Sequence, residues 1–456
     1  MNENKSYEIV VIGGGPAGIT LAKYLGKNFK MAIIRPEDHS MIYCAMPYVI
    51  ENLIPIERTL KKDQLVTDAG AELIRGKVER IDYDDRSLQL SGGEWVYYEK
   101  LVIATGANPF LPPVSGKDLR GVMGFKTGDD LTRILGLIKG GLKKAVVVGA
   151  GAIGVELAQA LQAGNISTTL IDAESTILPN MMDSEMVIRP TEELIRQGIH
   201  VIMNARISEL RGHEYAEHLY LESGEVIHFD DLDECSIGDQ EPIKGLVVFA
   251  TGSRPELSLF KDSLLEIGQD GIKVTSRMET NLPGVYAYGD CMEFESGITG
   301  KIISGKLATN AVPMAKILAD NFLGRDRQYR GFYNGSATKV GKFFVGGTGM
   351  TARVAANEEI EIKVGYGETT SKFPMMPGTT PLRVKLVARA DNGKLLGGQV
   401  LSGEPVAARI DLLTYAIQFG GTVEDISHLS YSAQPYQSFM PAANAVVLAA
   451  EDLLAY

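Results

Sequence analysis

Three glycines at the same spacing occur twice in the chain, and this spacing is typical of a turn that holds a dinucleotide. The two sets are Gly13, Gly15 and Gly18, and Gly149, Gly151 and Gly154. In each set the first glycine permits a tight bend, the second lets a pyrophosphate approach the backbone, and the third lets a helix pack on a strand. One such turn can arise for packing reasons alone. Two copies, each between a strand and a helix, predict a protein that binds two dinucleotides.

Asp172 sets the predicted nucleotide preference of the second turn. It ends the strand after the helix, about 20 residues beyond the glycines, where a carboxylate accepts hydrogen bonds from a ribose and repels a 2′-phosphate. We therefore predict that this turn binds NADH and disfavours NADPH. Glu156 lies on the first helical turn. It is a candidate cofactor contact, although the helix dipole alone also favours a carboxylate there.

The first turn departs from the usual pattern. The strand after its helix ends at Arg35, where an acid is usual and where an arginine could meet a 2′-phosphate. A third segment favours FAD instead, because its strand ends in Gly289 and Asp290, and a carboxylate there suits a hydroxyl of the flavin ribityl chain. We expect Glu37 or backbone groups to hold the ribose of this FAD.

Cys44 is the candidate redox thiol. It lies just beyond the first strand–helix–strand unit, and the nearby Pro47 suits the first turn of a helix. A cysteine at a helix N-terminus gains thiolate character from the helix dipole. By residue type alone a cysteine is more often buried and inert, but the predicted flavin reverses that expectation. No second cysteine lies within five residues, which excludes an intramolecular Cys-Cys redox pair.

An internal repeat must position these residues. Its two copies share apolar runs of strand length on either side of the glycine turns, followed by a strand that ends in a Thr-Gly turn; the runs are 7–13, 31–34 and 101–106, and 144–149, 168–171 and 247–252. Their β-branched residues predict parallel strands covered on both faces.

Beyond about residue 330 the glycine fingerprint is absent and the pattern changes. Strand-length runs at 338–345, 382–388 and 394–401 and helical stretches at 405–418 and 442–454 predict an α+β domain. The acidic stretch 230–241 is predicted to be a solvated loop with an inert Cys235.

Composition sets limits on function. The chain has 456 residues and a net charge of −12, which argues against a nucleic-acid or anionic-membrane surface. No apolar run approaches the roughly 18 residues of a membrane helix, and the polar N-terminus carries no signal peptide. Three widely spaced cysteines form neither a disulfide framework nor a zinc pattern, so we expect a reducing cytoplasm and no metal. Among six histidines, His39 and His428 are minor candidates for a proton donor.

The chain resembles the pyridine nucleotide-disulfide oxidoreductases, in the branch with a single redox cysteine. The resemblance covers nearly the whole chain; its marks are the two glycine turns, the segment from Ser40 to Tyr48, residues 104–106, residues 177–186 and residues 288–291. It implies an α/β fold with two Rossmann-like nucleotide-binding domains, for FAD and NAD, and an α+β C-terminal dimerisation domain. The implied boundaries are 1–113 with 253–330 (FAD), 114–252 (NAD) and 331–456 (dimerisation).

The resemblance also implies roles for individual residues. Ala308 and Thr309 open a helix whose N-terminus would face the flavin pyrimidine. The other implied cofactor contacts are Ala104, Thr105, Gly106 and Gly252. In a homodimer, Tyr431 and Tyr436 are candidate catalytic residues that would complete the partner subunit's active site. A coenzyme A substrate would meet Thr20, Tyr24, Lys27, Ser40, Lys61 and Lys62, although a solvated basic patch explains the last two equally well.

At two places the chain departs from the family pattern, and these departures disfavour particular activities of the family. Pro16 stands inside the first glycine turn where the peroxidases carry a histidine, which disfavours peroxidase activity. Phe373 and its neighbours lack one of the tyrosines of the coenzyme A-disulfide reductases.

These features predict a cytoplasmic oxidoreductase that passes a hydride from NADH through FAD to a disulfide, persulfide or polysulfide at Cys44, with coenzyme A-linked sulfur as one candidate substrate. The nearest alternative is an NADH oxidase that reduces O₂ through a Cys44 sulfenate. A reductase for a small redox protein and a non-enzymatic redox sensor are further alternatives.

Overall fold

The structure is a computed structural model, and it describes residues 5–229, 231–236, 242–261 and 263–455. Tertiary contacts divide the chain into two discontinuous units. The first unit comprises Met1–Met46, Ile54–Pro109 and Ser253–Phe332, and the second comprises Pro47–Leu53, Phe110–Gly252 and Tyr333–Tyr456.

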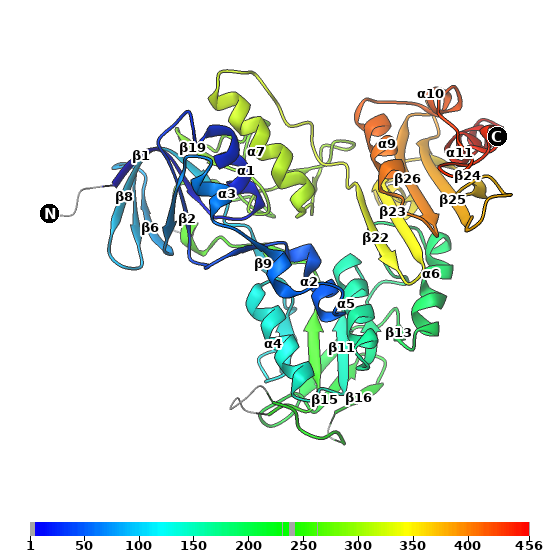
Figure 1. Cartoon of the computed structure of the whole chain (residues 1–456), viewed down its shortest axis with the longest axis horizontal. Helices are drawn as coiled ribbons and strands as arrows, with labels where there is room; N and C mark the ends of the chain where they lie inside the picture. Colours follow the sequence, from blue (N-terminus) through cyan, green and yellow to red (C-terminus); the bar gives the residue numbers. More distant parts are fainter. Residues whose placement is uncertain (1–4, 230, 237–241, 262, 456) are drawn as a thin grey trace. The chain divides into compact units, whose positions relative to one another are not determined.

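The first unit is built on a seven-stranded sheet. In spatial order its strands are β5 (Glu72–Arg75), β2 (Met31–Arg35), β1 (Lys5–Ile12), β8 (Trp95–Ile103), β7 (Ser87–Leu90) and β6 (Val78–Asp82), and β19 (Val285–Ala287) also pairs with β8. The strands around β1 are parallel, whereas β6 and β7 form antiparallel pairs. The helices of this unit are α1 (Pro16–Leu25), α3 (Gln64–Thr67) and α7 (Ala308–Phe322) (Figure 1).

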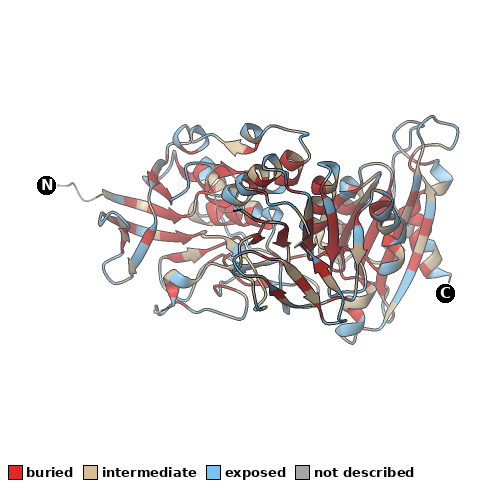
Figure 2. Ribbon diagram, turned by 90° about the horizontal axis from the view of Figure 1, so that it is seen from below, coloured by how far each residue is buried: buried red, intermediate tan, exposed pale blue. Residues whose placement is uncertain are grey.

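Burial on both faces explains the continuous apolar run of β1. Ile9 and Val11 belong to a core cluster shared with α1 and α7, whereas Val10 and Ile12 belong to a second cluster with β7 and the 3-10 turn η3 (Ser258–Phe260). Alternate side chains of a strand point to opposite faces, so both sets must be apolar. Figure 2 shows the buried residues concentrated along such strands.

Three short ladders hold the loops of the first unit. They are β3 (Ser40–Met41) with β4 (Leu60–Lys61), β9 (Ala107–Pro109) with β18 (Ser253–Pro255), and β20 (Phe294–Glu295) with β21 (Ile302–Ile303). The β9–β18 ladder pairs the segments that follow the two matched Thr-Gly turns.

The second unit contains a parallel five-stranded sheet. Its spatial order is β10 (Val122–Gly124), β17 (Leu246–Phe249), β11 (Lys144–Val148), β12 (Ser167–Ile171) and β13 (His200–Ile202). The helices α4 (Gly128–Lys139), α5 (Ala152–Ala163) and α6 (Ser184–Arg196) accompany it, and β14 (Ile207–Arg211), β15 (His218–Leu221) and β16 (Val226–His228) form an antiparallel sheet. The short α2 (Met46–Ile50) belongs largely to this unit.

The second unit also contains an antiparallel sheet near the C-terminus. Its order is β22 (Ser336–Val340), β23 (Phe343–Gly349), β26 (Leu395–Ser402), β25 (Pro381–Arg389) and β24 (Ile362–Thr370), accompanied by α8 (Ala352–Asn357), α9 (Ala407–Gln418), α10 (Val423–Ser427) and α11 (Ala445–Leu454). The run predicted as one strand at 338–345 is two strands, because the chain reverses at Gly341, whose φ is +57°.

The acidic stretch is only partly described, since residues 230 and 237–241 lie outside the described residues. Cys235 is buried and pairs with Ile243 through two backbone hydrogen bonds, and burial raises the pKa of its thiol. This environment agrees with an inert cysteine. In the part of the chain that the structure describes, no helix is long and apolar enough to cross a membrane.

Candidate active site

The first glycine turn has two closely packed glycines and an open one. A Cβ on Gly13, whose φ is +120°, would lie 2.1 Å from the oxygen of Ala104, and a Cβ on Gly18 would lie 2.3 Å from the oxygen of Gly13. A Cβ on Gly15 would meet no atom within 4 Å. Gly15 is also the N-cap of α1, where no side chain caps the helix within the described residues. This arrangement leaves backbone N–H groups for a phosphate, as an FAD site requires.

The second turn repeats this arrangement at the start of α5. A Cβ on Gly149, with φ +105°, would lie 2.6 Å from the oxygen of Ala250, and one on Gly154 would lie 1.8 Å from the oxygen of Gly149. A Cβ on Gly151 would again meet nothing within 4 Å, and the helix has no side-chain cap in its described surroundings. Both turns therefore fit a pyrophosphate by the same geometry.

Asp172 is held against the second turn. Its Oδ2 accepts a hydrogen bond from the backbone N–H of Ala150 at 2.5 Å, and its Oδ1 accepts one from that of Glu174 at 2.8 Å. Because each carboxylate oxygen has two lone pairs, both oxygens keep acceptor capacity for ribose hydroxyls. Gly252, with a φ of +92°, follows β17, which is the neighbour of β11 on the side opposite to β12.

The side chain of Arg35 is buried against the first glycine turn. Its side chain is 1% exposed and lies over Gly14, whose Cβ would come within 2.4 Å of the arginine Cδ. Its guanidinium donates hydrogen bonds to the backbone oxygens of Glu37 and Asp38 at 3.1 Å and to Asp63 at 2.5 Å. Burial lowers the pKa of Arg35, while Asp63 opposes that shift. The arginine thus fixes the turn that carries the exposed Glu37.

Asp63 joins this region although no pattern in the sequence predicts its role. Its second oxygen accepts a hydrogen bond from Arg75 at 2.5 Å, so one carboxylate joins two guanidinium groups. Asp63 is 28 residues from Arg35 along the chain, and no motif links the two positions.

Cys44 is exposed in a 3-10 turn (η1, Tyr43–Ala45) directly before α2. The β3–β4 ladder pairs Ser40 with Lys61 beside it. Burial lowers the pKa of the half-buried Lys61, and the neighbouring Cys44 opposes that shift, so the ammonium and the thiol interact. Lys62 is exposed. The hydroxyl of Ser40 belongs to a residue 3% exposed and has no hydrogen-bond partner among the described residues.

The predicted flavin contacts lie on neighbouring strands of the first unit. Ala104, Thr105 and Gly106 directly follow β8, and Asp290 follows the adjacent β19. The buried Cys291 contacts Thr105 and Gly106, and desolvation raises the pKa of its thiol to about 11, which makes it inert. Ala308 and Thr309 are exposed at the start of α7, where no side chain caps the helix within the described chain.

Of the predicted coenzyme A contacts near α1, Thr20 and Tyr24 lie in the helix and Lys27 does not. Thr20 is half-buried, with its hydroxyl donating to the oxygen of Pro16 at 2.7 Å, and Tyr24 is exposed. Lys27 is exposed but lies beyond the end of α1, because the helix stops at Leu25 and is capped by Gly26. The spacing of Thr20, Tyr24 and Lys27 in the sequence also predicts that all three lie on one face of a helix, and for Lys27 this prediction is wrong.

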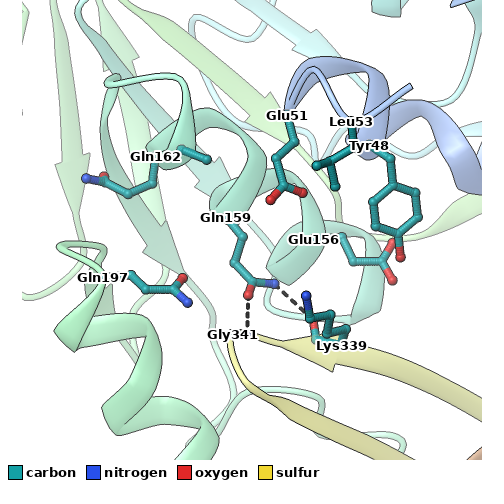
Figure 3. A pocket seen from close by; sticks show the side chains of 10 residues that line it. Tyr48, Glu51, Leu53, Glu156, Gln159, Gln162, Gln197, Lys339 and Gly341 are labelled. Atoms are coloured by element: carbon teal, nitrogen blue, oxygen red, sulfur yellow. Dashed lines mark hydrogen bonds between the residues drawn. The ribbon is translucent and has the colours of Figure 1, made fainter. Parts of the chain in front are cut away.

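Glu156 faces a cavity of about 320 Å³ within the second unit. The cavity is lined by Tyr48, Glu51, Leu53, Glu156, Gln159, Gln162, Ala163, Gln197, Lys339 and Gly341 (Figure 3). Burial raises the pKa of Glu156, and the hydroxyl of Thr338, which donates to it at 2.5 Å, opposes that shift. The segment that follows Cys44 thus lies against α5, at one wall of this cavity. Cofactor contact by Glu156 stays a prediction.

The C-terminal tyrosines are accessible. Tyr431 is 41% exposed and its hydroxyl donates to the oxygen of Pro441 at 2.5 Å, and Tyr436 is 58% exposed. The N–H of Phe373 donates to the oxygen of Pro435 at 3.2 Å. The two segments singled out in the C-terminal part of the sequence therefore lie next to each other.

Comparison with known proteins decides the family. The model of the pyridine nucleotide-disulphide oxidoreductases matches residues 7–315, and that of their dimerisation domain matches residues 336–442. The chain belongs to this family. An NADH oxidase of Methanocaldococcus jannaschii is 31% identical over 98% of both chains. An NAD(P)H coenzyme A polysulfide/persulfide reductase of Pyrococcus horikoshii is 27% identical over 93% of this chain and 94% of that protein.

A solved structure supports the same assignment. The NAD-dependent persulfide reductase from A. fulgidus matches with a TM-score of 0.89 and 25% identity, over 97% of this chain and 82% of that one. As a pyridine nucleotide-disulphide oxidoreductase, the chain is an NAD(P)H-dependent flavoprotein enzyme, so the predicted family, fold class and enzyme class are confirmed. The names of these relatives correspond to the two main activities predicted from the sequence.

Proposed function

We propose that the chain is an NADH-dependent FAD reductase that cleaves a sulfur–sulfur bond at Cys44. The observation that carries this proposal is the surroundings of this thiol: it is exposed, an ammonium from Lys61 interacts with it, and the buried Ser40 hydroxyl beside it lacks a partner among the described residues. An unpartnered buried hydroxyl costs free energy, so it favours a substrate that brings a hydrogen-bonding group.

The Cys44 thiolate attacks one sulfur of a substrate R–S–S–R′. A Cys44–S–S–R mixed disulfide forms and R′S⁻ leaves. FAD, when bound, supplies the two electrons that it has received as hydride from NADH. These electrons regenerate the Cys44 thiolate and release RS⁻, which takes up a proton. The sum is NADH, a proton and R–S–S–R′ giving NAD⁺, RSH and R′SH.

The glycine turns and Asp172 bind and orient the two nucleotides in this proposal. The turn at Gly15 would hold the FAD pyrophosphate; Glu37 and Asp63 would serve its ribose, Asp290 its ribityl chain, and Ala308 and Thr309 its pyrimidine. The turn at Gly151 holds NADH, and the carboxylate of Asp172 disfavours NADPH.

Coenzyme A persulfide or a coenzyme A disulfide is the substrate class that we favour. The name of the Pyrococcus relative supports it, as do the exposed Lys27 and Lys62 and the half-buried Lys61, because lysines suit phosphate groups. We further propose a cytoplasmic homodimer in which the partner subunit's Tyr431 and Tyr436 reach the substrate. The dimerisation domain supports the dimer, and the free cysteines suit a reducing compartment.

Reduction of O₂ is the second candidate, because the Methanocaldococcus relative is named an NADH oxidase. In that case Cys44 would cycle between thiolate and sulfenate. NADH consumption without oxygen separates the two activities. Rapid turnover with coenzyme A persulfide or polysulfide under argon supports the sulfur reductase, whereas turnover that needs oxygen and ignores added sulfur substrates supports the oxidase.

A further inference from the structure

At the start of α7 the charged side chain of Lys306 is buried, while the apolar residues that follow it are exposed. Its side chain is only 3% exposed, whereas the next residue, Leu307, is 37% exposed, and Ala308 and Thr309 are exposed as well. A buried lysine beside an uncovered leucine is the reverse of what the hydrophobic effect favours. Departures of this kind concentrate at functional sites.

The buried ammonium of Lys306 is paired with Asp270. The two side chains form a salt bridge and a hydrogen bond, and the carboxylate is 14% exposed. The exposed Arg254 lies 3.9 Å from the other oxygen of the same carboxylate. Removing one partner of such a pair leaves a buried charge without compensation, so the pair is a strong constraint on the loops that carry it.

Asp270 in turn is bound to the segment that follows Asp290. The N–H of Asp270 donates to Oε1 of Glu293 at 2.9 Å, and the carboxylate-bearing residue Glu293 is only 9% exposed. Backbone bonds from Ile272 to Cys291 and from Glu293 to Ile272 complete this contact. A continuous set of contacts therefore runs from Lys306 through Asp270 to the residues next to Asp290.

The direct chain connection between these two places is weak. It is the β20–β21 hairpin, which has only two residues in each strand. Such a hairpin has little stability of its own. The buried ion pair therefore adds a polar constraint across the hairpin, beside the apolar packing of Met292 and Phe294 with α7.

We propose that Lys306 and Asp270 are positioning residues for the flavin: their ion pair fixes the N-terminus of α7 relative to the Asp290 loop, and so sets the span between the pyrimidine and ribityl contacts. This inference rests on the FAD site of the proposed function. Neither residue needs to touch the flavin.

Binding of FAD to the flavin-free full-length protein tests the proposal, with the quenching of flavin fluorescence as the readout. We expect Lys306→Met and Asp270→Asn each to weaken FAD binding at least about tenfold and to shift the absorption spectrum of the bound flavin. The double variant should bind FAD no more weakly than the worse single variant, because the two residues act as a unit.

The other end of α7 provides a matched control. Asp320 is 11% exposed and pairs there with Arg325 at 2.7 Å and Arg327 at 2.6 Å. Asp320→Asn should lower the thermal unfolding midpoint but leave FAD affinity unchanged. Wild-type affinity in Lys306→Met, or an equal loss of affinity in Asp320→Asn, would overturn the proposal. Failure of the wild-type protein itself to bind FAD would instead refute the proposed function.

Discussion

Lys61 lies directly opposite Ser40 in the β3–β4 ladder, and its ammonium group interacts with Cys44. A two-residue ladder thus brings together a thiol, a cation and a buried hydroxyl that are up to 21 residues apart in the sequence. The proposed sulfur chemistry depends on this arrangement.

Replacing the Cys44 thiol separates reduction of the flavin by NADH from reduction of the sulfur substrate. Cys44→Ser should abolish NADH-dependent reduction of coenzyme A persulfide, because no sulfur remains to form the mixed disulfide. Bleaching of the flavin absorbance by NADH without acceptor should persist. Cys291→Ser is the matched control, since that thiol is fully buried. Undiminished persulfide reduction by Cys44→Ser would refute the role of this cysteine.

Removing the ammonium should slow the reaction of the thiol with electrophiles. For Lys61→Met we expect the rate of Cys44 alkylation by iodoacetamide at neutral pH to fall about threefold to fivefold, since a partly exposed ion pair is worth about 1 kcal/mol or less. The difference should shrink at high salt. Lys62→Met, at an exposed neighbouring position, should leave the rate unchanged. Equal rates in both variants and wild type would contradict the electrostatic role of Lys61.

Two alanine substitutions in the second glycine turn should act differently. Gly151→Ala adds a methyl group that meets no protein atom within 4 Å, so it should leave the thermal midpoint unchanged and raise the KM for NADH about tenfold by occupying the space for the pyrophosphate. Gly154→Ala would place a methyl 1.8 Å from the oxygen of Gly149 and should destabilise the fold by about 1–3 kcal/mol. Normal NADH kinetics in Gly151→Ala would argue against a nucleotide at this turn.

The carboxylate of Asp172 should control the choice between NADH and NADPH. In Asp172→Ala we expect the ratio of kcat/KM for NADH to that for NADPH to fall at least about tenfold, because ribose hydrogen bonds and the repulsion of the 2′-phosphate are both lost. Glu174→Gln, two residues away and exposed, serves as the control. A ratio that changes equally in both variants would show that Asp172 has no specific role.

A buried ion network stabilises the second unit in a pH-dependent way. Lys385 is 4% exposed and lies 2.7 Å from Asp183 and in contact with Glu185. Burial raises the pKa of Asp183, but the hydrogen bonds from Lys385, the Ala352 N–H and Gln399 and the charge of Lys385 together hold it below its ordinary value. Desolvation opposes the charge of Lys385 as well, yet its two carboxylate partners raise its pKa.

The sign of the pH effect follows from these directions. A carboxyl with a lowered pKa stabilises the fold above its ordinary value of about 4 and loses that contribution as acid protonates it. An amine with a raised pKa stabilises below its ordinary value of about 10.4 and loses that contribution in alkali. Lys385→Met should therefore destabilise the protein by about 3–5 kcal/mol near neutral pH, and less below pH 4.

Urea unfolding of Lys385→Met at several pH values measures this difference. Arg389→Met on the same strand is the control, because the Arg389–Asp391 pair is exposed and should contribute less than about 1 kcal/mol. A destabilisation that does not depend on pH would point to lost packing by the Lys385 side chain instead.

The sequence alone predicted the two glycine turns, Cys44 as the candidate thiol and the carboxylate of Asp172 at a strand end. These features are local: a glycine at positive φ, a helix start and a strand end are set by neighbouring residues, so a short motif is enough to predict them. The alternating burial of β1 likewise follows from its own residues. The domain boundaries and the roles of the individual site residues stay predictions.

Only the tertiary structure decided how distant side chains meet. The sequence gives no sign that Asp63 neutralises Arg35, that Lys61 lies beside Cys44, or that Lys306 is buried against Asp270. It also failed locally where Gly341 splits one predicted strand in two and where α1 stops before Lys27. The reason is physical: ladder register and buried ion pairs depend on the packing of segments far apart in the chain, and no spacing along the sequence encodes that packing.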